Sequence, residues 1–296
     1  MSKRALLLAI LGFGGSLQAV PGQPAQPPMI HGGAAAVSPD GSKIAFLSDR
    51  DGATDLFVIA ADGSGEARLT STPEAESQPD WSADGREIRF TVFANDESRI
   101  FSIAPTGQDR RLIGTVPGRA MRLSPDGKSI LYWTGTWTAM RLFASRLDGS
   151  EARPLTDGSG VVWGARWSPD GKRIAFGDKD AQGALQVFVI NADGSGRRRV
   201  TRFDEAGQQA QMPAWSPDGS RLAVQSGVRG QPAHIWIVDA VTGAARKLAA
   251  HTQPYDDEVP AWFPDGKRLV YQSTRTGRME VWVMNADGSQ ARQLTK

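Results

Sequence analysis

One short motif occurs six times along the chain and limits the folds it can adopt. In most copies an apolar or aromatic residue is followed by serine, proline, aspartate and glycine. The glycines at positions 41, 85, 127, 171, 219 and 266 are separated by 44, 42, 44, 48 and 47 residues. A tandem period of this length is typical of repeat proteins. The copies are Val37–Gly41, Trp81–Gly85, Leu123–Gly127, Trp167–Gly171, Trp215–Gly219 and Trp262–Gly266.

Each repeat predicts four strands, which we call a to d. Strand a runs into the motif, which is a tight turn because proline presets φ and glycine accepts the left-handed conformation. Strand b follows, for example at Ile174–Phe176, and then strand c at Val187–Ile190. Strand c is apolar at consecutive positions, so both its faces should be buried, whereas strand d alternates and should lie outermost. Six such units predict an all-β fold, a six-bladed β-propeller of four-stranded antiparallel blades.

The repeats also predict how the ring is held together. The first and the sixth repeat each supply four strands of their own, so we expect no strand exchange between the termini. The ring should then close through packing of the first blade on the sixth. Four motif tryptophans are expected to pack between neighbouring blades near the channel: Trp81, Trp167, Trp215 and Trp262.

Residues 1–19 have the pattern of a secretory signal peptide. Lys3 and Arg4 precede the apolar segment Ala5–Phe13, and Leu17–Ala19 forms a plausible cleavage site. A membrane anchor is the alternative, but the nine apolar residues fall short of the roughly 20 that span a bilayer. We therefore expect a periplasmic or secreted protein with no membrane span after cleavage.

The remaining sequence divides into a proline-rich linker at 20–30 and a propeller at 31–296. Without Lys3 and Arg4 the 34 basic residues become 32, which equals the 32 acidic ones, so the net charge is zero. A neutral chain gives no indication of a nucleic-acid partner. With no cysteine, disulfides and thiolate chemistry are excluded.

The repeated Trp-Ser-Pro-Asp-Gly-x-x-Ile-Ala-Phe, followed by an aromatic strand c and Ala-Asp-Gly-Ser, resembles the WD40-like PD40 repeat of the TolB propeller family. The resemblance covers residues 31–296. TolB itself carries an α/β domain before its propeller, for which this sequence has no room. The resemblance implies a monomeric, non-catalytic envelope protein that binds a protein or peptide, as TolB binds the lipoprotein Pal in the Tol–Pal system.

A second hypothesis is a metal-dependent, polysaccharide-active enzyme, because some lyases with PD40 repeats bind a metal through clustered histidines. This chain has three: His31, His234 and His251. His234 is the first residue of the predicted strand c in the fifth repeat. The residues at this position in the other repeats are polar, so a solvated histidine side chain is the simpler interpretation.

A serine peptidase is disfavoured because no Gly-x-Ser-x-Gly motif is present. The six motif aspartates are interpreted as turn residues and not as an acid array.

The candidate binding residues lie in the d–a connections and b–c hairpins, which should share one face of the ring, here called the loop face. Extra loop length in repeats 5 and 6, with grouped carboxylates, favours a cationic partner surface or a calcium ion at the channel mouth. No other cofactor and no catalytic residue is predicted. Trp137, in the unusual segment Thr134–Thr138, should reach the same face. The predicted partner-binding residues are Glu74, Glu76, Asp204, Glu205, Arg229, Tyr255, Asp256, Asp257, Glu258 and Arg275.

Overall fold

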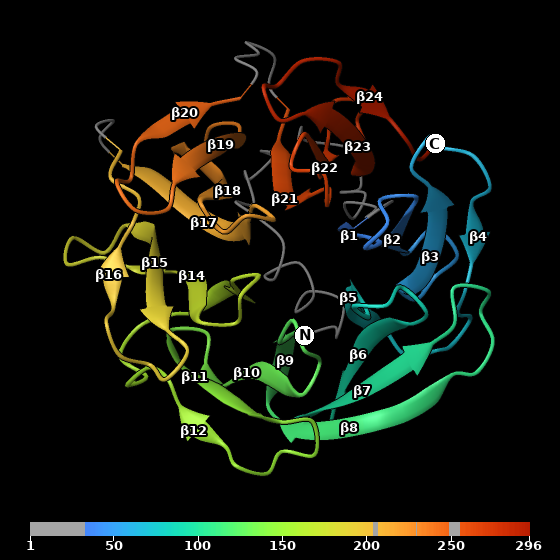
Figure 1. Ribbon diagram of the computed structural model, residues 1–296, viewed down its shortest axis with the longest axis horizontal. Coiled ribbons are helices and arrows are strands. Elements are labelled where there is room, and N and C mark those ends of the chain that lie inside the picture. Colours follow the sequence, from blue (N-terminus) through green and yellow to red (C-terminus); the bar gives the residue numbers. More distant parts are fainter. Residues whose placement is uncertain (1–32, 204–206, 229, 249–254) are drawn as a thin grey trace, which may run out of the picture.

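The computed structural model describes residues 33–203, 207–228, 230–248 and 255–296. These residues form 24 strands in six four-stranded antiparallel sheets, arranged as blades around a central axis (Figure 1). The predicted six-bladed β-propeller is confirmed. The predicted signal peptide, residues 1–19, and the linker, residues 20–30, lie outside the described residues. Within the described part, no helix is long and apolar enough to cross a membrane.

Every blade uses four strands that are consecutive in the sequence, from the innermost strand a to the outermost strand d. The first three blades are β1 (Gly33–Val37), β2 (Lys43–Ser48), β3 (Asp55–Ala60) and β4 (Ala67–Arg68); β5 (Glu76–Trp81), β6 (Ile88–Ala94), β7 (Glu97–Ile103) and β8 (Arg111–Pro117); β9 (Arg119–Leu123), β10 (Ser129–Thr136), β11 (Ala139–Arg146) and β12 (Arg153–Pro154). The last three are β13 (Trp163–Trp167), β14 (Arg173–Lys179), β15 (Leu185–Asn191) and β16 (Arg198–Arg199); β17 (Gln208–Trp215), β18 (Arg221–Val228), β19 (His234–Asp239) and β20 (Ala245–Lys247); β21 (Asp257–Trp262), β22 (Arg268–Ser273), β23 (Glu280–Asn285) and β24 (Arg292–Gln293).

Burial follows the predicted order of strands within a blade. Strand c is covered on both faces, since five consecutive residues are buried in β3 and again in β15. Strand d is short, and both residues of β4 and of β12 are exposed. The exception is β8, which has seven residues and pairs with β7 from Glu97 to Ser102. The cores therefore lie between blades, where adjacent sheets pack face to face.

The repeated motif forms the same turn in all six blades, on the side of the ring that we call the turn face. In the fifth blade Gly219 has φ 67°, in the left-handed region that glycine tolerates. The carboxylate of Asp218 accepts hydrogen bonds from Ser216 Oγ at 2.5 Å and from the backbone N–H of Ser220 at 3.0 Å. These bonds lower the pKa of Asp218 to about 2. The aspartates are turn residues, as predicted.

The motif tryptophans join neighbouring blades, as predicted. In three of them the indole N–H donates to a backbone carbonyl in the inner strand of the preceding blade. The bonds are Trp81 to Ala36 at 3.0 Å, Trp215 to Arg166 at 3.2 Å and Trp262 to Ala214 at 3.1 Å.

The ring closes without strand exchange, as predicted, because the described strands of the first and sixth blades form separate sheets. Figure 1 shows these blades, blue and red, side by side. We call their interface the seam. Phe46 and Phe263 belong to one buried cluster that crosses it. Arg292 of β24 also donates to the carbonyl oxygens of Ala61 at 2.6 Å and Asp62 at 3.1 Å.

Candidate functional site

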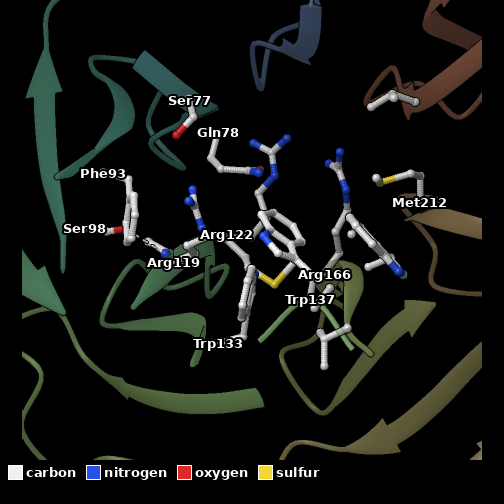
Figure 2. A pocket seen from close by; sticks show the side chains of 17 residues that line it. Ser77, Gln78, Phe93, Ser98, Arg119, Arg122, Trp133, Trp137, Arg166 and Met212 are labelled. Atoms are coloured by element: carbon white, nitrogen blue, oxygen red, sulfur yellow. Dashed lines mark hydrogen bonds between the residues drawn. The ribbon is translucent and has the colours of Figure 1, made fainter. Parts of the chain in front are cut away.

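A cavity opens on the loop face where the second, third and fourth blades meet the channel (Figure 2). We call it the aromatic cavity because Phe93, Trp133, Trp137 and Trp163 form much of its wall. Its volume of about 100 Å³ accommodates one side chain or a few waters. The loop face is where the sequence predicted binding, although in a different sector.

Trp137 is placed by a tight hairpin between β10 and β11. The register pairs Thr136 with Ala139, so Trp137 lies at the tip. Gly135, with φ 104°, supplies a conformation that other residues rarely adopt. The Trp137 ring packs edge-on against Trp133 at 5.2 Å between centroids and stacks on Trp163 at 5.8 Å. The unusual hairpin sequence thus builds a half-buried tryptophan platform.

Arg119, at the start of β9, lies between two aromatic rings of the cavity. Its guanidinium carbon is 3.8 Å from the centroid of Phe93 and 5.3 Å from that of Trp137. Burial lowers the pKa of Arg119, but a guanidinium keeps its charge at neutral pH. Cation–π attraction therefore fixes a positive charge at the rim of the aromatic cavity.

Two more arginines, Arg122 and Arg166, line both the aromatic cavity and a second hollow on the turn face. We call their level the channel waist. Arg122 has 5% of its surface exposed and donates to the carbonyl of Pro79. The Arg166 guanidinium has no hydrogen-bond or ion-pair partner within the described residues. Burial, and secondarily the charge of Arg122, lowers the pKa of Arg166, whereas Asp80 opposes this shift.

The wall of the cavity also contains four residues in the left-handed region, three of which are not glycine. Gln78, Met212 and Val259 have φ of 53°, 51° and 46°, and Gly164 has 60°. Each lies at a register shift of its inner strand. A β-branched residue such as Val259 is rare in this region, and each such residue costs about 1–3 kcal/mol. Strain of this kind is often found at binding sites, and here all four residues line one cavity.

The predicted acidic sector is partly brought together by the sixth blade. Asp257 is 3% exposed and pairs with Arg275, whose Nη2 is 3.0 Å from both carboxylate oxygens. Arg275 lies over the ring of Tyr255 at 4.7 Å. Glu258 is 2% exposed and accepts from Gln225 at 2.9 Å. The predicted residues of this sector therefore form an internal network.

The other predicted residues lie elsewhere. Glu74 pairs with Arg99, and Glu76 is buried and accepts from Thr70 at 2.9 Å and from Thr72 at 3.0 Å. Burial raises the pKa of Glu76 to about 7.

The carboxylate of Asp256 accepts from the backbone N–H of Ala233 at 2.8 Å. Asp204, Glu205 and Arg229 lie outside the described residues. None of the predicted partner-binding residues that the structure describes lines the aromatic cavity, and their part in recognition stays a prediction. Trp137, which was expected to reach the loop face, does line it.

The metal hypothesis rested on three histidines. His31 and His251 lie outside the described residues, and His234 begins β19 with its side chain half-buried. Among the residues that the structure describes, no three histidine, aspartate or glutamate side chains are grouped as metal ligands.

The sequence profile of the PD40 family, the TolB beta propeller domain, matches residues 28–160, 78–212 and 137–296. The chain belongs to this family. The resemblance drawn from the repeated motif is thereby confirmed.

The relatives of this PD40 chain differ in size. The uncharacterized protein Atu1656 of Agrobacterium fabrum is 30% identical over 198 residues, which are 63% of this chain and 67% of that protein. Tricorn protease homolog 1 of Streptomyces coelicolor is 30% identical over 228 residues, 70% of this chain and 20% of the relative. The crystal structure of TolB from Acinetobacter baumannii aligns with a TM-score of 0.68 at 22% identity, covering 89% of this chain and 63% of TolB. These similarities show the shared propeller.

Proposed function

We propose that this PD40 propeller is an exported protein that binds a protein or peptide partner at its loop face and does not act as an enzyme. The observation that supports this most directly is the aromatic cavity. Tryptophan and arginine dominate the binding energy of protein interfaces, especially in central pockets that exclude water. Here Trp137 stacks on Trp163 and the Arg119 guanidinium lies over the Trp137 ring, so these contacts hold all three side chains in place around the cavity.

The size of the cavity limits what enters it. About 100 Å³ accepts one side chain or a chain end, and excludes a folded domain. The partner would therefore insert a protruding residue while the surrounding loops contact its flanks. In this proposal the loops of the fifth and sixth blades, with the predicted acidic residues, form another part of the rim. A calcium ion there remains part of the proposal.

The proposed location is the periplasm or the outside of the cell. It follows from the predicted signal peptide at 1–19 and is supported by the similarity to TolB. The metal-dependent lyase remains an alternative hypothesis, for which the described site offers no specific support.

The proposal is tested by capturing partners from an envelope extract with immobilised mature protein. Trp137→Ala should weaken capture about tenfold or more, because it removes the centre of the aromatic platform. The matched control is Lys128→Ala, an exposed residue beside the turn of the third blade on the opposite face. Lys128→Ala should melt like the parent, and Trp137→Ala should keep the fold, as circular dichroism would show, with a lower melting temperature because its contacts with Trp133 and Trp163 are lost. Normal capture by Trp137→Ala together with loss of capture by Lys128→Ala would place binding on the turn face and refute the proposal.

A further inference from the structure

The charged residues lining the aromatic cavity are all basic. Arg119, Arg122 and Arg166 line it, and among the residues that the structure describes no aspartate or glutamate does. Asp80, whose charge acts on Arg122 and Arg166, lines the hollow on the turn face. Whatever enters from the loop face therefore meets an aromatic wall and three positive charges.

Arg122 and Arg166 occupy the same position in successive blades, immediately before the first residue of the turn motif. Their guanidinium groups are close enough for the charge of one to lower the pKa of the other. Two like charges removed from water repel each other and lose hydration, and the nearby charge of Asp80 offsets this cost only in part, because the pKa of both arginines is still lowered.

The scaffold does not require a long side chain at this position. The residues at the equivalent position in the first, fifth and sixth blades are Ala36, Ala214 and Ala261. Alanine there leaves the inner strand and the tryptophan bonds intact, since Ala36 and Ala214 both accept such a bond. Alanine is thus sufficient for the scaffold at this position, yet two neighbouring blades carry arginine there. We take this as an indication that the two arginines bind a ligand.

We propose that the channel waist is a carboxylate-binding site, in which Arg122 and Arg166 hold a carboxylate of the partner segment below the aromatic cavity. This inference rests on the proposed function and specifies the partner as a peptide with an acidic group beside an apolar residue. The carboxylate belongs either to an aspartate or glutamate side chain or to the end of the chain.

The chemistry of the two arginines fits a carboxylate. A guanidinium presents paired N–H donors that match two carboxylate oxygens, and such charge-assisted bonds are stronger than neutral ones. Arg166 has its donors free of other partners within the described residues, whereas Arg122 uses one donor on Pro79. The residue next to the carboxylate would then lie against Trp137 and Trp163, which line the same cavity.

The experiment uses probes that differ in the carboxylate alone. Binding of N-acetyl-L-phenylalanine and of N-acetyl-L-phenylalaninamide to the mature protein is measured by calorimetry and by tryptophan fluorescence. The acid should bind about tenfold or more tightly than the amide, because the amide lacks the charge. Equal affinities, or no binding of the acid, would overturn the proposal.

Two variants test whether the preference for the acid over the amide arises at the channel waist. Arg166→Gln should weaken binding of the acid about tenfold or more and leave binding of the amide unchanged. Lys128→Gln removes a positive charge on the turn face and should change neither. If Arg166→Gln keeps its fold but binds the acid as the parent does, the waist is not the site.

Further probes separate the sources of the anion. N-acetyl-phenylalanyl-aspartate amide carries only a side-chain carboxylate, so its binding relative to the first probe identifies which carboxylate is preferred. Either preference supports the proposal, whereas tighter binding of inorganic phosphate than of both would replace the carboxylate site by a phosphate site. These measurements need no partner, so the two proposals can fail separately. If Trp137→Ala captures partners as the parent does, the proposed function is rejected, whereas the carboxylate site is still supported if the probes bind as expected.

Discussion

The indole N–H of Trp262 donates a 3.1 Å hydrogen bond to the backbone carbonyl of Ala214, in the inner strand of the preceding blade. The same bond joins Trp215 to Arg166 at 3.2 Å. Each of these tryptophans is buried, so the bond gives a partner to the indole N–H of one blade and to the backbone carbonyl of the preceding blade. In the copies that begin with Trp81, Trp215 or Trp262, the motif thus specifies more than a turn, because its first residue also bonds one blade to the next.

The first prediction concerns this bond. Trp262→Ala should lower the free energy of unfolding by about 3–5 kcal/mol, as for other large buried aromatics. Trp262→Phe keeps most of the packing but leaves the Ala214 carbonyl without its donor, so the expected loss is smaller, about 1–3 kcal/mol. Urea unfolding followed by circular dichroism measures both. An unchanged midpoint for Trp262→Ala would contradict the assigned packing.

The second prediction separates a functional arginine from a structural one. Arg166→Met removes a partly desolvated charge without a partner in the described residues, so the melting temperature should stay the same or rise. Arg173→Met is the matched control, because Arg173 donates to the carbonyl of Gly219 at 3.1 Å and covers the Trp215 ring at 4.6 Å. The control should melt at a lower temperature. Equal losses in both variants would assign Arg166 to the scaffold.

The third prediction concerns pH. Burial, with nearby Asp256 adding to it, raises the pKa of Glu258 to about 8. The folded state then binds more protons than the unfolded state, so the stability from this group is complete at acidic pH and is lost as pH rises towards about 8.

Glu258→Gln keeps an oxygen for Gln225 but cannot ionise. We expect the variant to be more stable than the parent, by a margin that widens from about pH 5 to about pH 8. Thermal unfolding measured across that range tests this, at about 2–4 °C per kcal/mol. Glu97→Gln, an exposed position in β7, serves as the control. A constant difference across the range would show that Glu258 is already charged in the folded state.

The fourth prediction concerns the linker. The first blade obtains its inner strand from β1, which pairs with β2 through Gly33 and Leu47, Ala36 and Ala45, and Val37 and Ile44. Deleting residues 20–30 should therefore leave the melting temperature unchanged. A drop of several degrees would instead show that the deleted segment contributes to a terminal blade.

The sequence predicted the fold well because the same local rules are repeated in it. Proline and glycine in the motif determine the turn, and consecutive apolar residues in strand c report burial on both faces. Neither signal depends on distant residues. The motif tryptophans could likewise be assigned to blade boundaries because a large ring next to a turn must be buried against a neighbour.

The site was harder to predict because its residues are single side chains from different blades. Arg122 and Arg166 are 44 residues apart, and each looks like an ordinary polar residue in an alternating strand. Trp137 was recognisable from its unusual hairpin, but its stacking on Trp163 depends on how two blades pack. In the acidic sector, the sequence showed grouped carboxylates but not that Asp257 is paired and Glu258 buried.

The absence of strand exchange in the described sheets also bears on how the ring forms. Each ladder joins strands that are neighbours in the sequence, so a blade can assemble as soon as its own segment is available. The seam is different, since Arg292 and Asp62 are 230 residues apart. Closing so long a loop carries the largest entropic cost in the fold. Folding is then expected to proceed blade by blade, with ring closure as its last step.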